Sequence, residues 1–132
     1  MIEWKDAYSI GIPMLDEQHQ KLFQFSNDLE SIIQDGEVSE NLMWESIQYL
    51  ENYANMHFGK EEMCMFKYQC PIAEKNQEAH TRFIAFYNFL SERMKKEGIT
   101  HRMAREFHWF IEQWLIEHIC KIDVHLKDCV SR

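Results

Sequence analysis

Six side chains that can bind metal ions lie on or beside the apolar stripes of predicted helices. Four are imidazoles and two are carboxylates: His19, His57, His80, His118, Glu61 and Asp123. Charged groups are rarely buried without partners, so their place among apolar residues calls for an explanation. A single histidine in a core is more often a hydrogen-bonded structural residue than a metal ligand. Imidazoles together with carboxylates suit iron or a similar divalent ion, and one metal centre would account for all six.

The spacing of these residues indicates how they would meet. His57 and Glu61 are four residues apart, so both project from one face of a helix. His118 and Asp123 are five residues apart, which is about 140° round an ideal helix. They converge on one point only if the helix widens locally. We therefore expect a π-bulge between His118 and Asp123.

The elements that carry these residues are predicted to be long helices, because only four Gly and two Pro interrupt the chain. Asp16, Ser39 and Thr100 are plausible N-caps. The pattern predicts an irregular arm over about 1–15 and helices over about 16–35, 39–67, 72–97 and 101–129. Short loops indicate an all-α, antiparallel up-down-up-down four-helix bundle, in which core metal sites take ligands from facing helices. At 132 residues the chain fits one domain.

The charge and hydropathy of the chain exclude several classes of function. The net charge is −8, from 22 acidic and 14 basic side chains, and no basic stripe for phosphate binding is present, so no nucleic-acid partner is expected. No apolar run has the length of a membrane span, and Glu3, Lys5 and Asp6 do not fit a signal peptide. We expect a cytoplasmic protein with no membrane partner.

The four cysteines show neither a C-x-x-C pair nor a zinc-site spacing. They are Cys64, Cys70, Cys120 and Cys129. We expect reduced, partly buried thiols.

The other histidines and two acids near the candidate ligands are interpreted more simply. His101, His108 and His125 are expected at the surface or in support of a ligand. Glu62 and Glu78 are expected in solvent, with the alternative that either swings in as a ligand.

Five sequence motifs carry a resemblance to a known family, and together they span nearly the whole chain. They are Trp4-x-x-x-Tyr8-x-x-Gly11-Ile12, Asp16-Glu17-Gln18-His19, His57-Phe58-x-x-Glu61-Glu62-x-x-Met65, His80-x-x-Phe83, and Trp114-Leu115-x-x-His118-Ile119-x-x-x-Asp123. In this order they resemble the hemerythrins, and in particular the single-domain bacterial form.

The resemblance implies a site with two non-haem iron ions and a bridging oxo or hydroxo group. By resemblance, His19 and His57 ligate one iron, His80 and His118 ligate the other, and Glu61 and Asp123 bridge them. It implies dioxygen as the ligand, bound at the iron that has an open position, in a pocket formed by Phe58, Leu115 and Ile119. It also implies a monomer that carries, stores or senses dioxygen.

Two positions depart from the family pattern. Where the family has two histidines four residues apart, this chain has Asn76 and His80, and the usual Tyr before the proline is Cys70. An amide oxygen is a weaker ligand than imidazole, so Asn76 marks a weak or lost ligand position. Water or a small anion could occupy that position. Two alternatives follow: an enzyme that turns over peroxide, nitric oxide or an oxidisable metal, or an iron-binding bundle with incomplete occupancy.

Overall fold

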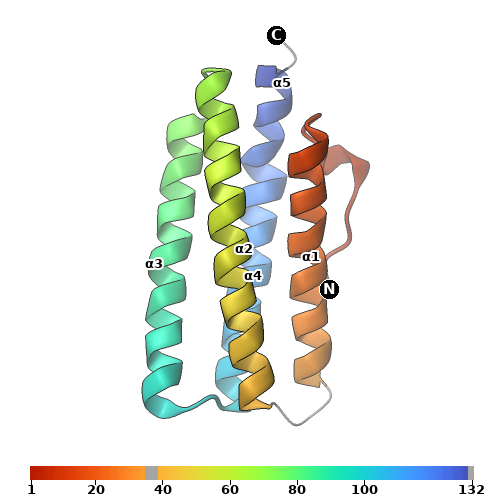
Figure 1. Cartoon of the computed structure of the whole chain (residues 1–132). Coiled ribbons are helices and arrows are strands. Elements are labelled where there is room, and N and C mark those ends of the chain that lie inside the picture. The colour runs from red at the N-terminus through yellow and green to blue at the C-terminus, as the bar shows by residue number, and fades with distance from the viewer. Residues whose placement is uncertain (35–38, 131–132) are drawn as a thin grey trace.

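Four long helices make up most of the chain in this computed structural model, which describes residues 1–34 and 39–130. They are α1 (Pro13–Gln34), α2 (Glu40–Lys67), α3 (Ala73–Glu97) and α4 (His101–Lys121). Short 3-10 helices, η1 (Asp6–Tyr8) and η2 (Asp123–His125), precede α1 and follow α4, and α5 (Leu126–Val130) ends the described chain. Successive long helices run in opposite directions (Figure 1). The expected all-α, up-down-up-down bundle is confirmed, and the described residues contain no strand.

Two of the four long helices, α2 and α4, begin with a side-chain N-cap. Ser39 Oγ accepts a hydrogen bond from Leu42 N at 3.3 Å, and Thr100 Oγ1 accepts one from Met103 N at 3.1 Å, as an N-cap does. The prediction that Asp16 caps the first helix is wrong. That helix begins at Pro13, a residue favoured in the first turn. The expected end of this helix at 35–36 lies outside the described residues.

Asp16 instead fastens the arm to α1. Its carboxylate accepts hydrogen bonds from Ser9 Oγ at 2.6 Å and from Ile10 N at 2.9 Å. Further along the arm, the ring of Trp4 packs against Phe23 of α1 with 5.6 Å between ring centroids. The arm therefore lies along the bundle as a packed segment (Figure 1).

The predicted π-bulge between His118 and Asp123 is wrong, because the chain tightens there. The amide of Ile122 still donates to the carbonyl of His118 at 2.9 Å, as in an α-helix. α4 then ends, and η2 follows, with the amide of His125 donating to Ile122 O at 3.1 Å. A 3-10 turn has fewer residues per turn than an α-helix. The end of α4 and the tighter turn after it thus direct the Asp123 side chain toward His118 and His19.

A disulfide joins the two ends of the chain's second half, which corrects the expectation of four reduced thiols. Cys70, in the connection between α2 and α3, is bonded to Cys129 of α5, with their Cα atoms 5.6 Å apart. Both lie in a small apolar cluster at this end of the bundle, beside Met65 and Leu126. Cys64 and Cys120 are free thiols.

Among the described helices, none has the combination of length and apolar character that crossing a membrane requires.

Candidate metal centre

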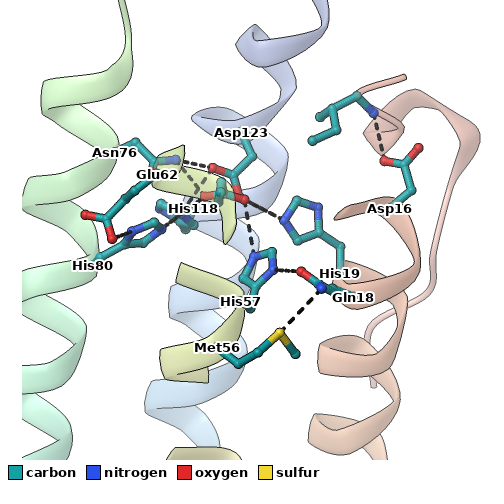
Figure 2. A network of polar contacts seen from close by, with 12 residues as sticks. Asp16, Gln18, His19, Met56, His57, Glu62, Asn76, His80, His118 and Asp123 are labelled. Atoms are coloured by element: carbon teal, nitrogen blue, oxygen red, sulfur yellow. Dashed lines mark hydrogen bonds and ion pairs between the residues drawn. The ribbon is translucent and has the colours of Figure 1, made fainter. Parts of the chain in front are cut away.

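The six predicted ligands converge at one level of the bundle core. His19 comes from α1, His57 and Glu61 from α2, His80 from α3, His118 from α4 and Asp123 from η2, and all six side chains are buried. In Figure 2 the side chains of four histidines and one carboxylate point toward one another: His19, His57, His80, His118 and Asp123. We call the six predicted ligands the core cluster.

One half of the core cluster is built around His19 and His57. His19 Nε2 lies 2.9 Å from Glu61 Oε2 and 3.3 Å from Asp123 Oδ2. His57 Nε2 lies 3.2 Å from the same Glu61 oxygen. Two imidazoles and two carboxylate oxygens therefore face one point.

The other half is built around His80 and His118. His80 Nε2 lies 3.0 Å from Glu61 Oε1, and His118 Nε2 lies 3.1 Å from Asp123 Oδ1. The Nε2 atoms of the two histidines are 2.9 Å apart. Glu61 and Asp123 thus each present one oxygen to one pair of histidines and the second oxygen to the other pair. This is the arrangement of two carboxylates that bridge two adjacent ions.

The carboxylates and the burial of the core cluster shift the pKa values of its ionisable groups. Burial lowers the pKa of His19, but its contacts with Asp123 and Glu61 outweigh burial and raise that pKa to about 10. The same competition raises the pKa of His118 to about 9. Burial acts to raise the pKa of Glu61, yet hydrogen bonds from the surrounding histidines hold it well below its usual value. Burial lowers the pKa of His57.

The donor set fits a pair of divalent ions better than it fits a network of hydrogen bonds. Two buried atoms that face the centre of the core cluster, His57 Nε2 and Asp123 Oδ2, accept or donate no hydrogen bond with any described residue. Buried polar groups in folded proteins are normally paired. Imidazole nitrogens with shared carboxylate oxygens form the mixed nitrogen and oxygen environment that iron and related ions prefer.

Asn76 lies inside the core cluster and is fully buried. Its Nδ2 donates hydrogen bonds to Glu61 Oε1 at 2.8 Å and to Asp123 Oδ1 at 2.6 Å, while its Oδ1 has no partner. The two ends of an amide differ only in which atom is oxygen, and their assignment follows the hydrogen-bond network. Turned over, the same amide would point its oxygen at the half held by His80 and His118.

Gln18 contacts the ring nitrogen of His57 that faces away from the carboxylates, and the sequence did not predict this role. Its Oε1 lies 2.7 Å from His57 Nδ1, and its Nε2 lies 3.5 Å from Met56 Sδ (Figure 2). If Gln18 Oε1 accepts a hydrogen bond from His57 Nδ1, the other ring nitrogen, Nε2, is free to bind an ion. The position of Gln18 beside His19 in the sequence does not predict this contact, because adjacent residues of a helix point in different directions.

The two acids considered as replacement ligands stay outside the cluster. Glu62 Oε2 is 3.9 Å from His80 Nδ1, on the side of the ring that faces away from Glu61. Glu78 is exposed.

Aromatic and aliphatic side chains close the cluster on one side. The ring of Phe58 stacks on His80 with 4.0 Å between centroids, and the ring of Trp114 stacks on His118 at 4.3 Å. Leu115 and Ile119, one turn of α4 apart, are buried in the same core. A groove of about 870 Å³ between α3 and α4 has Trp114 and His118 in its lining. The cluster therefore approaches solvent along this groove.

Comparison with known proteins gives one consistent result. The family model described as the hemerythrin HHE cation binding domain matches residues 10–130. A bacteriohemerythrin of Stenotrophomonas maltophilia is 24% identical over 131 residues, which cover 99% of this chain and 82% of that protein. A bacteriohemerythrin of Methylococcus capsulatus is 24% identical over 143 aligned positions, which cover 99% of this chain and 98% of that protein. A hemerythrin-like protein of Naegleria gruberi is 26% identical over 124 residues, which cover 94% of this chain and 89% of that protein.

Proposed function

The chain belongs to the hemerythrin family, a family of cation-binding domains, and from this premise we propose that it binds dioxygen at a di-iron centre formed by the core cluster. His19 and His57 would hold one iron, and His80 and His118 the other. Glu61 and Asp123 would bridge the two ions, with an oxo or hydroxo group completing the bridge. The observation that carries the proposal is that each carboxylate offers one oxygen to each pair of histidines.

The bound ferrous ions would supply the electrons that dioxygen accepts on binding. The surrounding side chains would keep water from the ligand. Phe58, Leu115 and Ile119 are assigned to this pocket, and their burial beside His80 and His118 supports the assignment. A dry pocket slows the loss of a charged ligand to solvent protons. Carriage, storage and sensing of dioxygen share this chemistry.

An enzyme is the second candidate, and Asn76 is the observation that favours it. A third histidine at this position would saturate the ion held by His80 and His118. The neutral amide binds that ion more weakly or leaves the position to water or a small anion. The two ions would then resemble each other, as in the oxidase-type carboxylate sites of other helical bundles. Peroxide and nitric oxide are the substrates that such a site would take.

One experiment separates these candidates. Iron-loaded protein is reduced without air, dioxygen is admitted, and the visible spectrum is followed during and after removal of the gas. A spectrum of oxygenated protein that reverses under vacuum supports the carrier. Direct conversion to the oxidised form, together with repeated turnover of peroxide and a reductant, supports the enzyme. An iron content near one per chain would support a bundle with incomplete occupancy instead.

The cytoplasmic location and the monomeric state expected from the sequence stay proposals. The Cys70–Cys129 bond bears on the first, because reducing compartments keep most thiols reduced. Alkylation of free thiols in freshly lysed cells, followed by mass spectrometry, would show whether this pair is oxidised where the protein works.

A further inference from the structure

A second group of metal-ligating side chains converges between α1 and α4, away from the core cluster. Glu30 comes from α1, and His108 and Glu112 lie four residues apart on α4, which places them on one face of that helix. His108 Nε2 is 3.3 Å from Glu112 Oε2 and 4.0 Å from Glu30 Oε2. One donor atom from each residue lies within 4.8 Å of the others. We call these three residues the peripheral cluster.

The peripheral cluster cannot share an ion with the core cluster. Glu30 follows His19 by eleven residues on α1, and His108 precedes His118 by ten on α4. At 1.5 Å of rise per residue, the two clusters are separated by about 15 Å along the bundle. The peripheral cluster is therefore a separate arrangement, held by α1 and α4 alone.

The two carboxylates of the peripheral cluster are largely removed from solvent and need a positive charge. The side chains of Glu30 and Glu112 are 22% and 21% exposed, and that of His108 is 12% exposed. No Lys or Arg within the described ranges forms an ion pair with either carboxylate. The cation that does is the amino terminus of Met1, 3.0 Å from Glu30 Oε2 and 3.6 Å from Glu112 Oε1. The cluster thus already attracts a cation.

The donor atoms of the peripheral cluster already surround a cation. Glu30 Oε2 is paired with the Met1 ammonium at 3.0 Å and lies 4.0 Å from His108 Nε2. Apart from Glu112, the nearest hydrogen-bonding group to His108 Nε2 is Ser26 Oγ, at a long 3.5 Å. A surface cavity of about 500 Å³ has Glu30, His108 and Glu112 in its lining, so an ion can reach them from solvent.

We propose that Glu30, His108 and Glu112 form a second divalent-cation site. One imidazole with two carboxylates is a mixed nitrogen and oxygen donor set, which suits first-row transition ions such as Mn²⁺ or Zn²⁺. Binding displaces the terminal ammonium from the carboxylates and uses a ring nitrogen of His108 as the third ligand. This site stands on its own residues and does not depend on the proposed dioxygen chemistry.

Manganese is the probe that tests the site, because free Mn²⁺ is counted directly by electron paramagnetic resonance. Full-length protein whose core cluster has been loaded with iron is titrated with Mn²⁺. Wild-type protein is expected to bind one more equivalent than His108→Ala. Glu112→Gln should weaken that equivalent roughly tenfold or more, since even indirect partners of a metal ligand contribute this much. The matched control is His101→Ala, because His101 lines the same cavity and instead bonds the carbonyl of Ile33.

Two further measurements keep the result specific. Iron content and circular dichroism should be the same in all four proteins, which shows that the fold and the core cluster are intact. In the wild type, Mn²⁺ should selectively broaden the ring-proton signals of His108. If wild type and His108→Ala bind equal amounts of Mn²⁺, or if the His108 signals stay sharp, the three residues are an ion-pair network and the proposal is wrong.

Discussion

At the residue scale, the most informative side chain is Asn76. Its amide contacts the carboxylates of Glu61 and Asp123, at 2.8 Å and 2.6 Å, in the place where the family pattern has a histidine. It fixes the orientation of Glu61 and Asp123 in the metal-free protein. In the loaded protein it can offer only a weak oxygen ligand. In the proposed di-iron site, Asn76 would therefore set how much the two ions differ.

Asn76→His is expected to raise iron retention roughly tenfold or more and to slow autoxidation, because imidazole is the stronger ligand. The measurements are iron release to a chelator and the decay rate of the oxygenated spectrum. Gln77→His is the matched control, since it adds an imidazole one residue away at an exposed position. No change in Asn76→His would mean that another ligand already fills the gap.

Gln18 offers a second test at this scale. Gln18→Leu removes the acceptor that holds His57 Nδ1, so metal affinity should fall by roughly 10- to 100-fold, the usual effect of losing such a partner. Competition with a chelator measures the affinity. Gln20→Leu, at an exposed position two residues away, should leave it unchanged. Equal affinities in the two variants would show that Gln18 does not orient His57.

The sequence was sufficient to find the six clustered side chains, because imidazoles and carboxylates stand out on apolar stripes. It could not give the contacts of Asn76 or the support from Gln18. Both depend on which side chain of another helix faces them, and residue spacing along one helix does not carry that information.

At the element scale, helix starts at Ser39 and Thr100 followed from capping rules, while two features near the end of the chain did not. The turn after α4 was expected to widen and instead tightens. Both solutions re-aim Asp123, and only tertiary packing selects between them. The Cys70–Cys129 pairing was also missed, because cysteines 59 residues apart carry no sequence signal of contact.

The disulfide should stabilise the element that follows Asp123. α5 has five residues and cannot persist alone as a helix. Closing a loop of 59 residues contributes about 4 kcal/mol in the chain-entropy description. Cys129→Ser should lower the free energy of unfolding by about that amount and speed iron release, because Asp123 lies just before α5. Urea unfolding and chelator kinetics measure these effects.

Cys64→Ser is the control for this prediction, since Cys64 is a half-buried free thiol near the same end of the bundle. It should change the free energy of unfolding by less than about 1 kcal/mol. If Cys129→Ser were as mild as Cys64→Ser, the disulfide would contribute nothing to the stability of this end.

At the scale of the whole molecule, the core cluster links stability to pH. In the metal-free protein, the pKa of His19 is raised to about 10 and that of His118 to about 9. A histidine whose pKa is raised by folding stabilises the folded protein. This stabilisation is fully present below the pKa of the unfolded state, near 6.5, and is lost as the pH rises through the pKa of the folded state. Metal-free protein should therefore lose stability to urea between pH 7 and 10.

The lowered pKa of Glu61 acts at the other side of this range. Its contribution is present above the ordinary carboxyl pKa and is lost as pH falls through the folded value. The metal-free protein should thus be most stable between about pH 5 and 7. Iron-loaded protein, in which metal replaces the protons, is the control and should show a smaller loss at high pH. Equal losses in the two forms would contradict this account.

The bundle as a whole works as a frame that brings one side chain or two from each helix to a single level. The central claim is that Glu61 and Asp123 are shared between two ions. The most direct test is the iron content of anaerobically loaded protein, combined with X-ray absorption to detect iron beside iron. We predict two ions per chain with an iron neighbour in the wild type and in Glu62→Gln, and one or none in Glu61→Gln. A wild type with one ion, or with two ions that have no iron neighbour, would contradict the claim.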